Sequence, residues 1–431
     1  MKKRKVFSTA AAALAAVSML SVLPMNAWAA GSSYSNTLTT ANDKKFTSFN
    51  KYLVMDVNAN VPNATFSYSI TPGTAIEAAG GNLAVLAGIG TPTVDSAVFT
   101  NGATTYAETE ATTNNDTVEF TTTNITTDEK YAKETLTIDF SSVAFTEPGV
   151  YRYIITESGT NQGITNDSIL KRTLDVYVED DTTGEPKQLK IAGYVMYSDE
   201  INTAPSSTVG TGNQETDIPN GAEAGTKSNS YTNTYSTHDL TFSKEVTGNQ
   251  GSKDKYFKFT VNISGAVAGT VYDVDLTNAD SSSGSNAATL TDNQNKTNPA
   301  SITVGTDGTI SADFYLQHGQ SIVIKGIADG TAYTITEDNE DYKPSTALSN
   351  TSDKNTGENE GTDITIGDNQ NSISDTALKA DTEVTFTNNR TGVIPTGILI
   401  SIAPAAIIGL IVIAGIVFLA VKNKRRETEE D

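Results

Sequence analysis

The chain has 431 residues and a formal net charge of −22, with no cysteine and only two histidines. This negative charge argues against nucleic acid or an anionic membrane surface as a partner, and the absence of cysteine excludes disulfides. Two histidines are too few for a histidine-based metal site, and no nucleophile-elbow, zinc-protease, P-loop or dinucleotide-binding motif is present. We therefore expect no metal, no cofactor and no enzymatic activity on an external substrate.

Residues 1–29 have the pattern of a secretory signal peptide. Four basic residues at positions 2–5 precede an apolar run that ends at Leu23, and Ala27-Trp28-Ala29 forms a small-x-small cleavage site. The chain is therefore predicted to be exported. Exported proteins often gain durability from disulfides, so this protein needs another source of it or does without.

The central part of the chain has the periodicity of β-strands. Apolar, β-branched and aromatic residues recur in ten segments separated by Gly, Pro, Asn and Asp, namely 65–70, 135–140, 150–156, 173–178, 188–197, 240–246, 256–263, 321–327, 332–337 and 383–388. The pattern restarts after Ser236 and the length suits two domains, which we place at 30–236 and 237–390. The predicted fold is all-β, with tandem Ig-like β-sandwiches and Greek-key connections.

The C-terminal segment has the pattern of a membrane anchor. Residues 398–421 carry no charge and are long enough to cross a bilayer as a helix. The basic tail 422–431 follows, which places the C-terminus in the cytoplasm. Just before the span, segment 391–397 contains Ile394, Pro395, Thr396 and Gly397.

This order of short motif, apolar span and basic tail resembles the cell-wall sorting signal of Gram-positive surface proteins. A sortase cuts such signals between Thr and Gly and joins the threonine to an amine. The usual pattern is Leu-Pro-x-Thr-Gly, whereas Pro395 and Thr396 are adjacent here. The motif is similar to the x-Val-Pro-Thr-Gly variant of some streptococcal pilins, so the span is expected to be a temporary tether.

The two halves of the chain repeat one order of polar residues on matching strands. Each half opens with a strand that carries a lysine, continues to a Tyr-x-x-Thr-Glu strand, and closes with an aromatic-Thr-Asn strand. The resulting sets are Lys51/Glu157/Asn233 and Lys244/Glu337/Asn388. Asn389 competes with Asn388, and only one can take part because neighbours on a strand face opposite ways. Lys44 and Lys45 compete with Lys51.

Such a set can form an amide between two side chains when it is buried. Desolvation lowers the pKa of lysine and raises that of glutamate, so the neutral amine becomes a nucleophile toward the asparagine carboxamide. A protonated glutamic acid can then donate to the carboxamide oxygen and pass the proton to the departing ammonia. The aromatic residues Tyr153, Tyr231, Tyr333 and Phe386 are candidates for the dry shell.

This constellation resembles the isopeptide-forming domains of Gram-positive pilins, and most closely the two-domain streptococcal major pilin of T-antigen type. The most specific pieces are PNATFSYSI, FTEPGVYRYIITE, GTAYTITED and TFTNN. The resemblance implies one Lys–Asn isopeptide bond per domain, Lys51–Asn233 and Lys244–Asn388, formed with the help of Glu157 and Glu337. Each bond would be a single self-modification of the chain, not an enzymatic activity.

The predicted function is that of a structural subunit in a covalent pilus shaft on the cell surface. A pilin-type sortase would join Thr396 to a lysine of the next copy, with minor pilins and peptidoglycan as further partners and the plasma membrane as a precursor site only. Lys227, in GTKSNSYTN, resembles the acceptor position of the family, and an ordinary loop lysine is the alternative. The alternative function is a cell-wall-anchored monomeric adhesin or stalk, with segment 71–134 as a ligand surface.

Overall fold

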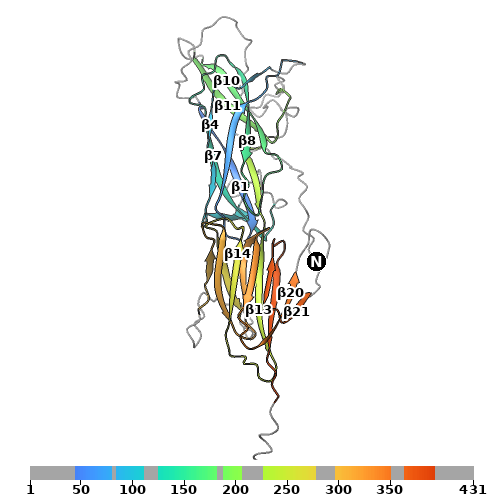
Figure 1. The fold of residues 1–431 in the computed structure, drawn as a ribbon. Coiled ribbons are helices and arrows are strands. Elements are labelled where there is room, and N and C mark those ends of the chain that lie inside the picture. Colours follow the sequence, from blue (N-terminus) through green and yellow to red (C-terminus); the bar gives the residue numbers. More distant parts are fainter. Residues whose placement is uncertain are drawn as a thin grey trace, which may run out of the picture.

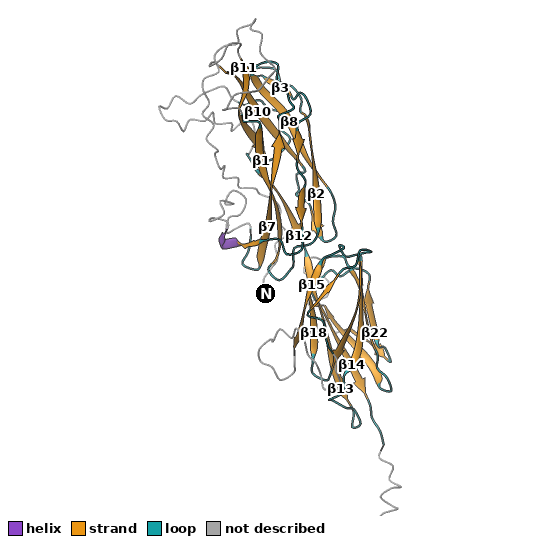
Figure 2. Ribbon diagram, turned by 90° about the vertical axis from the view of Figure 1, so that its left-hand side faces the viewer, coloured by secondary structure: helices purple, strands orange, loops and turns teal. Residues whose placement is uncertain are grey.

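The structure is a computed structural model that describes residues 44–79, 84–110, 125–181, 188–205, 227–277, 297–350 and 364–393. Two β-rich units stack end to end along one long axis (Figures 1 and 2). The N-terminal unit spans residues 46–235 and the C-terminal unit spans residues 237–389. Only Ser236 lies between the last strand of one unit and the first strand of the other.

The N-terminal unit is a sandwich of two sheets. One sheet has the order β4-β7-β1-β12-β9 with β6 beside β7, and the other has the order β11-β10-β8-β2-β5 with β3 beside β8. Its elements are β1 (Phe46–Asp56), β2 (Ala64–Pro72), β3 (Val85–Ala87), β4 (Thr93–Val94), β5 (Ala97–Phe99), β6 (Thr105–Ala107), the 3-10 turn η1 (Glu108–Glu110), β7 (Glu129–Asp139), β8 (Gly149–Ser158), β9 (Ile164–Thr165), β10 (Lys171–Asp181), β11 (Gln188–Tyr197) and β12 (Ser230–Tyr235).

The C-terminal unit repeats this plan. A seven-stranded sheet with the order β16-β15-β18-β13-β23-β20-β21 faces a four-stranded sheet with the order β17-β14-β19-β22. The strands are β13 (Thr237–Thr247), β14 (Phe257–Ser264), β15 (Val271–Thr277), β16 (Ser301–Thr303), β17 (Thr309–Leu316), β18 (Ser321–Ala328), β19 (Ala332–Glu337), β20 (Lys343–Asn350), β21 (Ile364–Asp368), β22 (Ser372–Asp375) and β23 (Thr382–Asn389).

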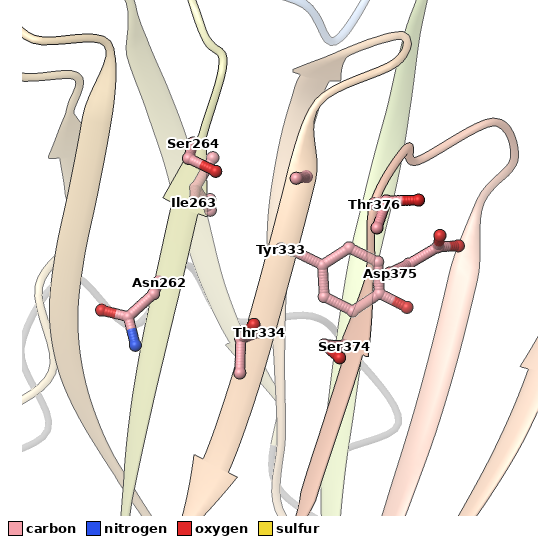
Figure 3. Close-up of a pocket in the computed structure, with 9 residues that line it drawn as sticks. Asn262, Ile263, Ser264, Tyr333, Thr334, Ser374, Asp375 and Thr376 are labelled. Atoms are coloured by element: carbon pink, nitrogen blue, oxygen red, sulfur yellow. The ribbon is translucent and has the colours of Figure 1, made fainter.

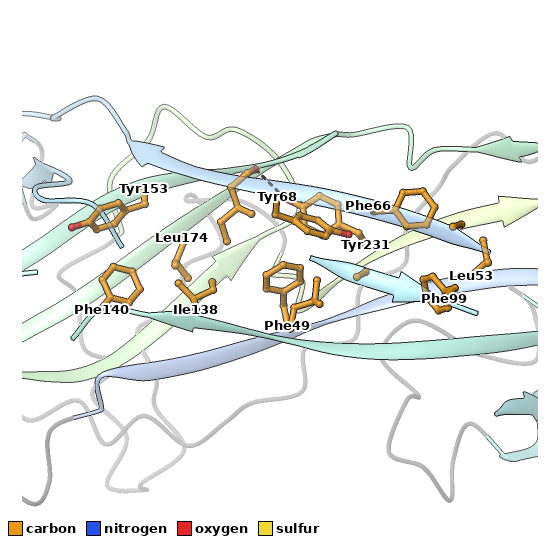
Figure 4. Close-up of a cluster of buried hydrophobic side chains, with 14 of the residues drawn as sticks. Phe49, Leu53, Phe66, Tyr68, Phe99, Ile138, Phe140, Tyr153, Leu174 and Tyr231 are labelled. Atoms are coloured by element: carbon orange, nitrogen blue, oxygen red, sulfur yellow. Dashed lines mark hydrogen bonds between the residues drawn. The ribbon is translucent and has the colours of Figure 1, made fainter. Parts of the chain in front are cut away.

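Alternation along the strands builds the two cores. In β2 the side chains of Phe66 and Tyr68 are buried while their neighbours are exposed, as expected for a strand with one face in the core. The core of the N-terminal unit lies between its sheets, with Phe49, Phe66, Tyr68 and Tyr231 grouped together (Figure 4). A second cluster fills the C-terminal unit in the same way.

The first and last strands of each unit are hydrogen-bonded neighbours that run in parallel. β1 lies parallel to β12, with Lys51 opposite Tyr231 and Leu53 opposite Asn233. β13 lies parallel to β23, with Lys244 opposite Phe386. Parallel neighbours require a long connection, and in both units the whole sandwich forms that connection.

The predicted all-β fold of tandem sandwiches is confirmed, and each of the ten predicted strand segments falls largely within a strand. Sequence patterns missed most of the short strands, and segment 71–134 contains β3, β4, β5 and β6, where no strong strand was expected. Among the described residues, no helix reaches the length and hydropathy that a bilayer span requires. The predicted signal peptide, sorting motif and membrane span (1–29, 394–397 and 398–421) lie outside the described residues.

Direct contacts hold the two units together. The Asn60 side chain donates to the carbonyl of Val271 at 3.1 Å and to the Asp273 carboxylate at 3.0 Å. Gly326 adopts a φ of 66°, and a Cβ there would approach the Cα of Ala59 to 3.0 Å, so the conformation and the close packing both favour glycine. The junction is therefore packed and hydrogen-bonded.

A buried ion pair lies on the outer face of the β8–β10 ladder. Arg152 and Asp175 stand opposite each other in register, and two parallel hydrogen bonds of 2.7 and 2.8 Å join guanidinium and carboxylate. Both side chains are almost fully buried, and burial raises the pKa of Asp175 even beside the arginine. Such a pair depends on both partners, because removal of one leaves an uncompensated charge.

We expect Arg152→Met to lower the free energy of unfolding by about 3–5 kcal/mol, because Asp175 then stays buried without its cation. The double variant Arg152→Met/Asp175→Leu should recover most of this loss. Urea unfolding followed by circular dichroism measures both values. A single variant that is no less stable than the double variant would contradict the interpretation.

Candidate functional site

The first predicted set of residues comes together inside the N-terminal unit. Lys51 lies on β1, Glu157 on β8 and Asn233 on β12, and all three are at most 1% exposed. The Lys51 Nζ lies 2.9 Å from Oε1 and 2.7 Å from Oε2 of Glu157. The Asn233 Nδ2 donates to the same Oε1 at 2.8 Å. One carboxylate oxygen thus bridges the amine and the carboxamide.

Register explains why Lys51 and Asn233 meet. Lys51 is opposite Tyr231 on the parallel strand β12, and Asn233 follows two residues later, so both side chains point to the same face of the sheet. That face is the core, because the inward neighbours Phe49 and Leu53 are buried there. Asn233 is therefore adjacent to the amine.

Aromatic rings enclose this first site. The Lys51 Nζ lies 4.8 Å from the centre of the Phe66 ring and 6.0 Å from that of Tyr231. Tyr68 stands opposite Glu157 on β2, and its hydroxyl donates to Oε2 at 2.8 Å. The dry surroundings raise the pKa of the Tyr68 hydroxyl well above its ordinary value, which keeps it a donor.

Burial favours the neutral form of the lysine in the first site. Desolvation lowers the pKa of Lys51 from 10.5 to about 8, against the opposing effect of the Glu157 carboxylate. A share of the amine is then neutral near physiological pH, which is the form that attacks a carboxamide. The first site therefore favours the neutral form of this amine more than water does.

The second set of residues forms the same arrangement in the C-terminal unit. Lys244 on β13, Glu337 on β19 and Asn388 on β23 are at most 1% exposed. The Lys244 Nζ and the Asn388 Nδ2 lie 2.7 and 2.8 Å from the same Oε1 of Glu337. Asn388 again follows two residues after the residue opposite the lysine, here Phe386.

Desolvation acts on both titratable groups of the second site. It lowers the pKa of Lys244 to about 8 and raises the pKa of Glu337. The Lys244 Nζ also lies 4.7 Å from the centre of the Phe257 ring. Phe257 and Phe259 on β14 occupy the positions that Phe66 and Tyr68 hold on β2, since Phe259 stands opposite Glu337. The second site therefore lacks the hydroxyl that Tyr68 supplies to the first.

The structure separates the competing residues named from the sequence. Asn388 points into the core, whereas Asn389 is exposed and donates to the Thr247 hydroxyl. Lys44 is exposed and precedes β1. Lys45 also precedes β1 and is half-buried rather than in the core.

Lys227 lies apart from both triads, at an isolated bridge to Tyr197, and is half-buried. The amine of Lys227 is therefore not part of a buried triad. The sorting motif Ile394–Gly397 lies outside the described residues. Its expected role stays a prediction.

Two details of the sites differ from the sequence expectation. The Asn233 amide nitrogen, not its oxygen, faces Glu157, so the carboxylate accepts a hydrogen bond from Nδ2 and does not contact the carbonyl oxygen. Of the predicted aromatic shell, Tyr231 and Phe386 lie opposite the lysines, while Tyr153 contacts Phe140 and the Ile89 carbonyl. The closer rings on β2 and β14 were missed, although their Phe-x-aromatic spacing was visible.

A surface cavity of about 280 Å³ lies over β14, β19 and β22, lined by Asn262, Tyr333 and Asp375 among others (Figure 3). It holds a single carboxylate and no lysine or histidine. Within the described part of the chain, no group of three His, Cys, Asp or Glu is placed to hold a metal. The two triads are therefore the candidate sites.

Comparison with known proteins gives family matches for both units. Residues 85–236 match a family described as a Spy0128-like isopeptide containing domain, and residues 238–390 match a family described as a domain of unknown function. A protein named pilin from Streptococcus pyogenes serotype M1 is 24% identical over 389 residues, covering 89% of this chain and 92% of its own.

Solved structures of similar proteins include two major pilins from Streptococcus pyogenes. Both are 20% identical and cover 81% of this chain and 99% of their own, with TM-scores of 0.49 and, for the T3.2 pilin, 0.48. The predicted resemblance to streptococcal major pilins is confirmed by the isopeptide-domain and sequence matches. A pilin is a structural protein, so the expectation that the chain is not an enzyme is confirmed too.

The lowered pKa of Lys51 predicts a pH dependence in Asn233→Ala, which keeps the lysine but has no carboxamide to attack. Between about pH 8 and pH 9.5 the unfolded chain binds a proton at Lys51 that the folded chain has released. The free energy of unfolding should therefore rise with pH, by at most about 1.4 kcal/mol per pH unit.

Urea unfolding across this range measures the slope. Its control is the variant Lys51→Met/Glu157→Gln/Asn233→Ala, in which tyrosine ionisation contributes equally but the buried lysine is gone. Parallel pH profiles of the two variants would contradict the lowered pKa.

Proposed function

Because the chain is a relative of the streptococcal pilins, we propose that it is a structural subunit of a covalent pilus shaft on a Gram-positive cell surface. Each unit, taken as the domains 30–236 and 237–390, is locked by one isopeptide bond. A sortase then joins successive copies head to tail, which generates an open filament. The observation that carries the proposal is the pair of buried Lys–Glu–Asn triads in equivalent registers.

The bond in the first unit forms when the Lys51 Nζ, having given a proton to Glu157, attacks Cγ of Asn233. The Nζ–Cγ bond forms, the carbonyl electron pair moves to Oδ1, and the Cγ–Nδ2 bond then breaks. Glu157 protonates the departing nitrogen, which leaves as ammonia, and takes back the proton that Nζ loses. Glu157 is close enough for both transfers, because the two nitrogens lie 2.9 and 2.8 Å from its Oε1.

The second bond uses Lys244, Glu337 and Asn388 in the same roles. Its support is the shared Oε1 and the raised pKa of Glu337, which favours the neutral acid that protonates a leaving group. The two bonds replace the durability that disulfides give other exported proteins. Within this proposal, they explain how a cysteine-free chain withstands an extracellular environment.

Polymerisation requires a donor and an acceptor at opposite ends of the subunit. β13 leaves the junction at Thr237, and the parallel β23 therefore ends, at Asn389, on the far side of the C-terminal unit. β12 runs toward the junction, so Lys227, which precedes it, lies farther from the junction than Tyr235. Thr396 as donor and Lys227 as acceptor suit a head-to-tail polymer.

The isopeptide bonds are tested by intact mass. The chain should be lighter than its sequence mass by two molecules of ammonia, and Glu157→Gln or Glu337→Gln should each restore one. Loss of a bond that closes such a long loop should lower the free energy of unfolding by about 5 kcal/mol in the chain-entropy model. Glu200→Gln, an exposed carboxylate, is the matched control. A wild-type chain of full sequence mass would refute the proposed chemistry.

The polymer is tested by immunoblots of cell-wall extracts boiled in detergent. We expect a ladder of high-mass bands in the wild type and a collapse to monomer in Lys227→Ala. Lys171→Ala, which removes an exposed lysine of the same unit, should keep the ladder. A ladder that persists in Lys227→Ala assigns another acceptor, and a single band in all strains leaves the anchored monomeric adhesin or stalk.

A further inference from the structure

The carboxamide oxygen of Asn233 accepts a hydrogen bond that takes no part in the proton transfers of Glu157. The backbone N–H of Asp167 donates to Asn233 Oδ1 at 2.8 Å. An N–H group only donates, so this contact identifies which atom of the amide is the oxygen. The nitrogen is bound in turn by Glu157 and by the Asn166 side-chain oxygen, at 2.8 and 3.1 Å. The electrophile is thus held in one orientation.

The loop that carries this N–H is fastened to β12. The Asp167 carboxylate accepts hydrogen bonds from Arg172 at 2.8 Å and from the backbone N–H of Thr232 at 3.0 Å. Arg172 also donates to the Ser198 carbonyl at 2.8 Å, and its guanidinium lies 4.6 Å from the centre of the Tyr231 ring. The loop is therefore held by Thr232, the residue before Asn233, and by Arg172, which lies against the Tyr231 ring. These contacts position the N–H before any reaction begins.

We propose that the Asp167 backbone N–H is an oxyanion donor for the first isopeptide bond, a role that rests on the proposed function. As the Lys51 Nζ attacks Cγ, the carbonyl pair moves to Oδ1, and this N–H stabilises the negative charge that develops there. Donors of this kind lie 2.7–3.1 Å from the position that the oxyanion will occupy, and the Asp167 N–H already lies 2.8 Å from Oδ1 before the attack. The proton transfers of Glu157 are unchanged, and ammonia still leaves from the opposite side of the amide.

The second site has no equivalent of this donor, so the donor is not a general property of the triads. Asn388 Oδ1 and Glu337 Oε2 have no hydrogen-bond partner within the described part of the chain. With no donor on Oδ1, the carbonyl of Asn388 has no equivalent of the Asp167 N–H, and Glu337 contacts the nitrogen of this amide instead. The two sites therefore differ at the carbonyl oxygen of the asparagine, which meets a fixed backbone N–H in the first and no donor among the described residues in the second.

The test compares two chains that differ in one N–H. Residues 30–396 are made by cell-free translation with the native aspartate at position 167, or with L-malic acid there, so that an ester replaces the N–H while the carboxylate that holds the loop is kept. Bond formation is followed after synthesis by mass spectrometry of cross-linked peptides. The second bond, Lys244–Asn388, forms in the same molecule and reports on synthesis and timing, and near-ultraviolet circular dichroism reports on the fold.

The ester also provides an independent readout. Mild base cleaves it, and the two pieces stay joined on a denaturing gel only if Lys51 is bonded to Asn233, because position 167 lies between them. We expect the first bond to form about a hundredfold more slowly in the ester chain than in the chain with the native aspartate, the usual cost of one oxyanion donor. The second bond should form equally in both.

If the Lys51–Asn233 bond forms at the same rate in the two chains, whatever that rate is, the N–H does not have the proposed role. That outcome leaves the proposed function standing as long as the wild-type chain carries both bonds. A wild-type chain without the first bond refutes the proposed function instead, so the two failures are distinguishable.

Discussion

The parallel pairing of the first and last strands is the constraint on which both sites depend. In each unit the asparagine follows two residues after the residue opposite the lysine, so strand alternation sends both side chains into the core. A shift of one residue would turn Asn233 to the other face and present Thr232 or Thr234 instead. The glutamate then needs only to reach the pair from the facing sheet, which β8 and β19 provide.

Burial of these triads couples their chemistry to folding. A lysine and a glutamate in a dry core cost free energy that their attraction does not fully offset, and the low pKa of Lys51 and Lys244 reflects that cost. In the unfolded chain the amine is hydrated and protonated, so it does not attack. In the proposed reaction the lysine becomes part of a neutral amide and the glutamate is left as the neutral acid, so the folded core loses the charges that destabilise it.

The fold and the triads were largely readable from the sequence, because period-two alternation marks both. Phe49-x-Lys51-x-Leu53 and Phe242-x-Lys244-x-Val246 each place a charged residue on an apolar strand face, as do Ile155-x-Glu157 and Ile335-x-Glu337. The Asp167 contact was not readable, because a backbone N–H carries no side-chain signature and its loop has no period. The short strands of segment 71–134 were missed for a related reason, since two or three residues show no alternation.

The two bonds do not carry load in the same way on the proposed linkage. Tension that enters at Lys227 follows β12 through Ser236 into β13, crosses from Lys244 to Asn388 and leaves toward Thr396. Lys51 is not on this path, so the first bond anchors β1 beside the loaded strand rather than transmitting force. The junction at Ser236 is loaded directly, and its N–H and carbonyl are bonded to Gly163 and Asp329 at 2.8 and 2.9 Å. Stiffness along the shaft therefore depends on the second triad and this junction, while the first triad maintains the fold that presents Lys227.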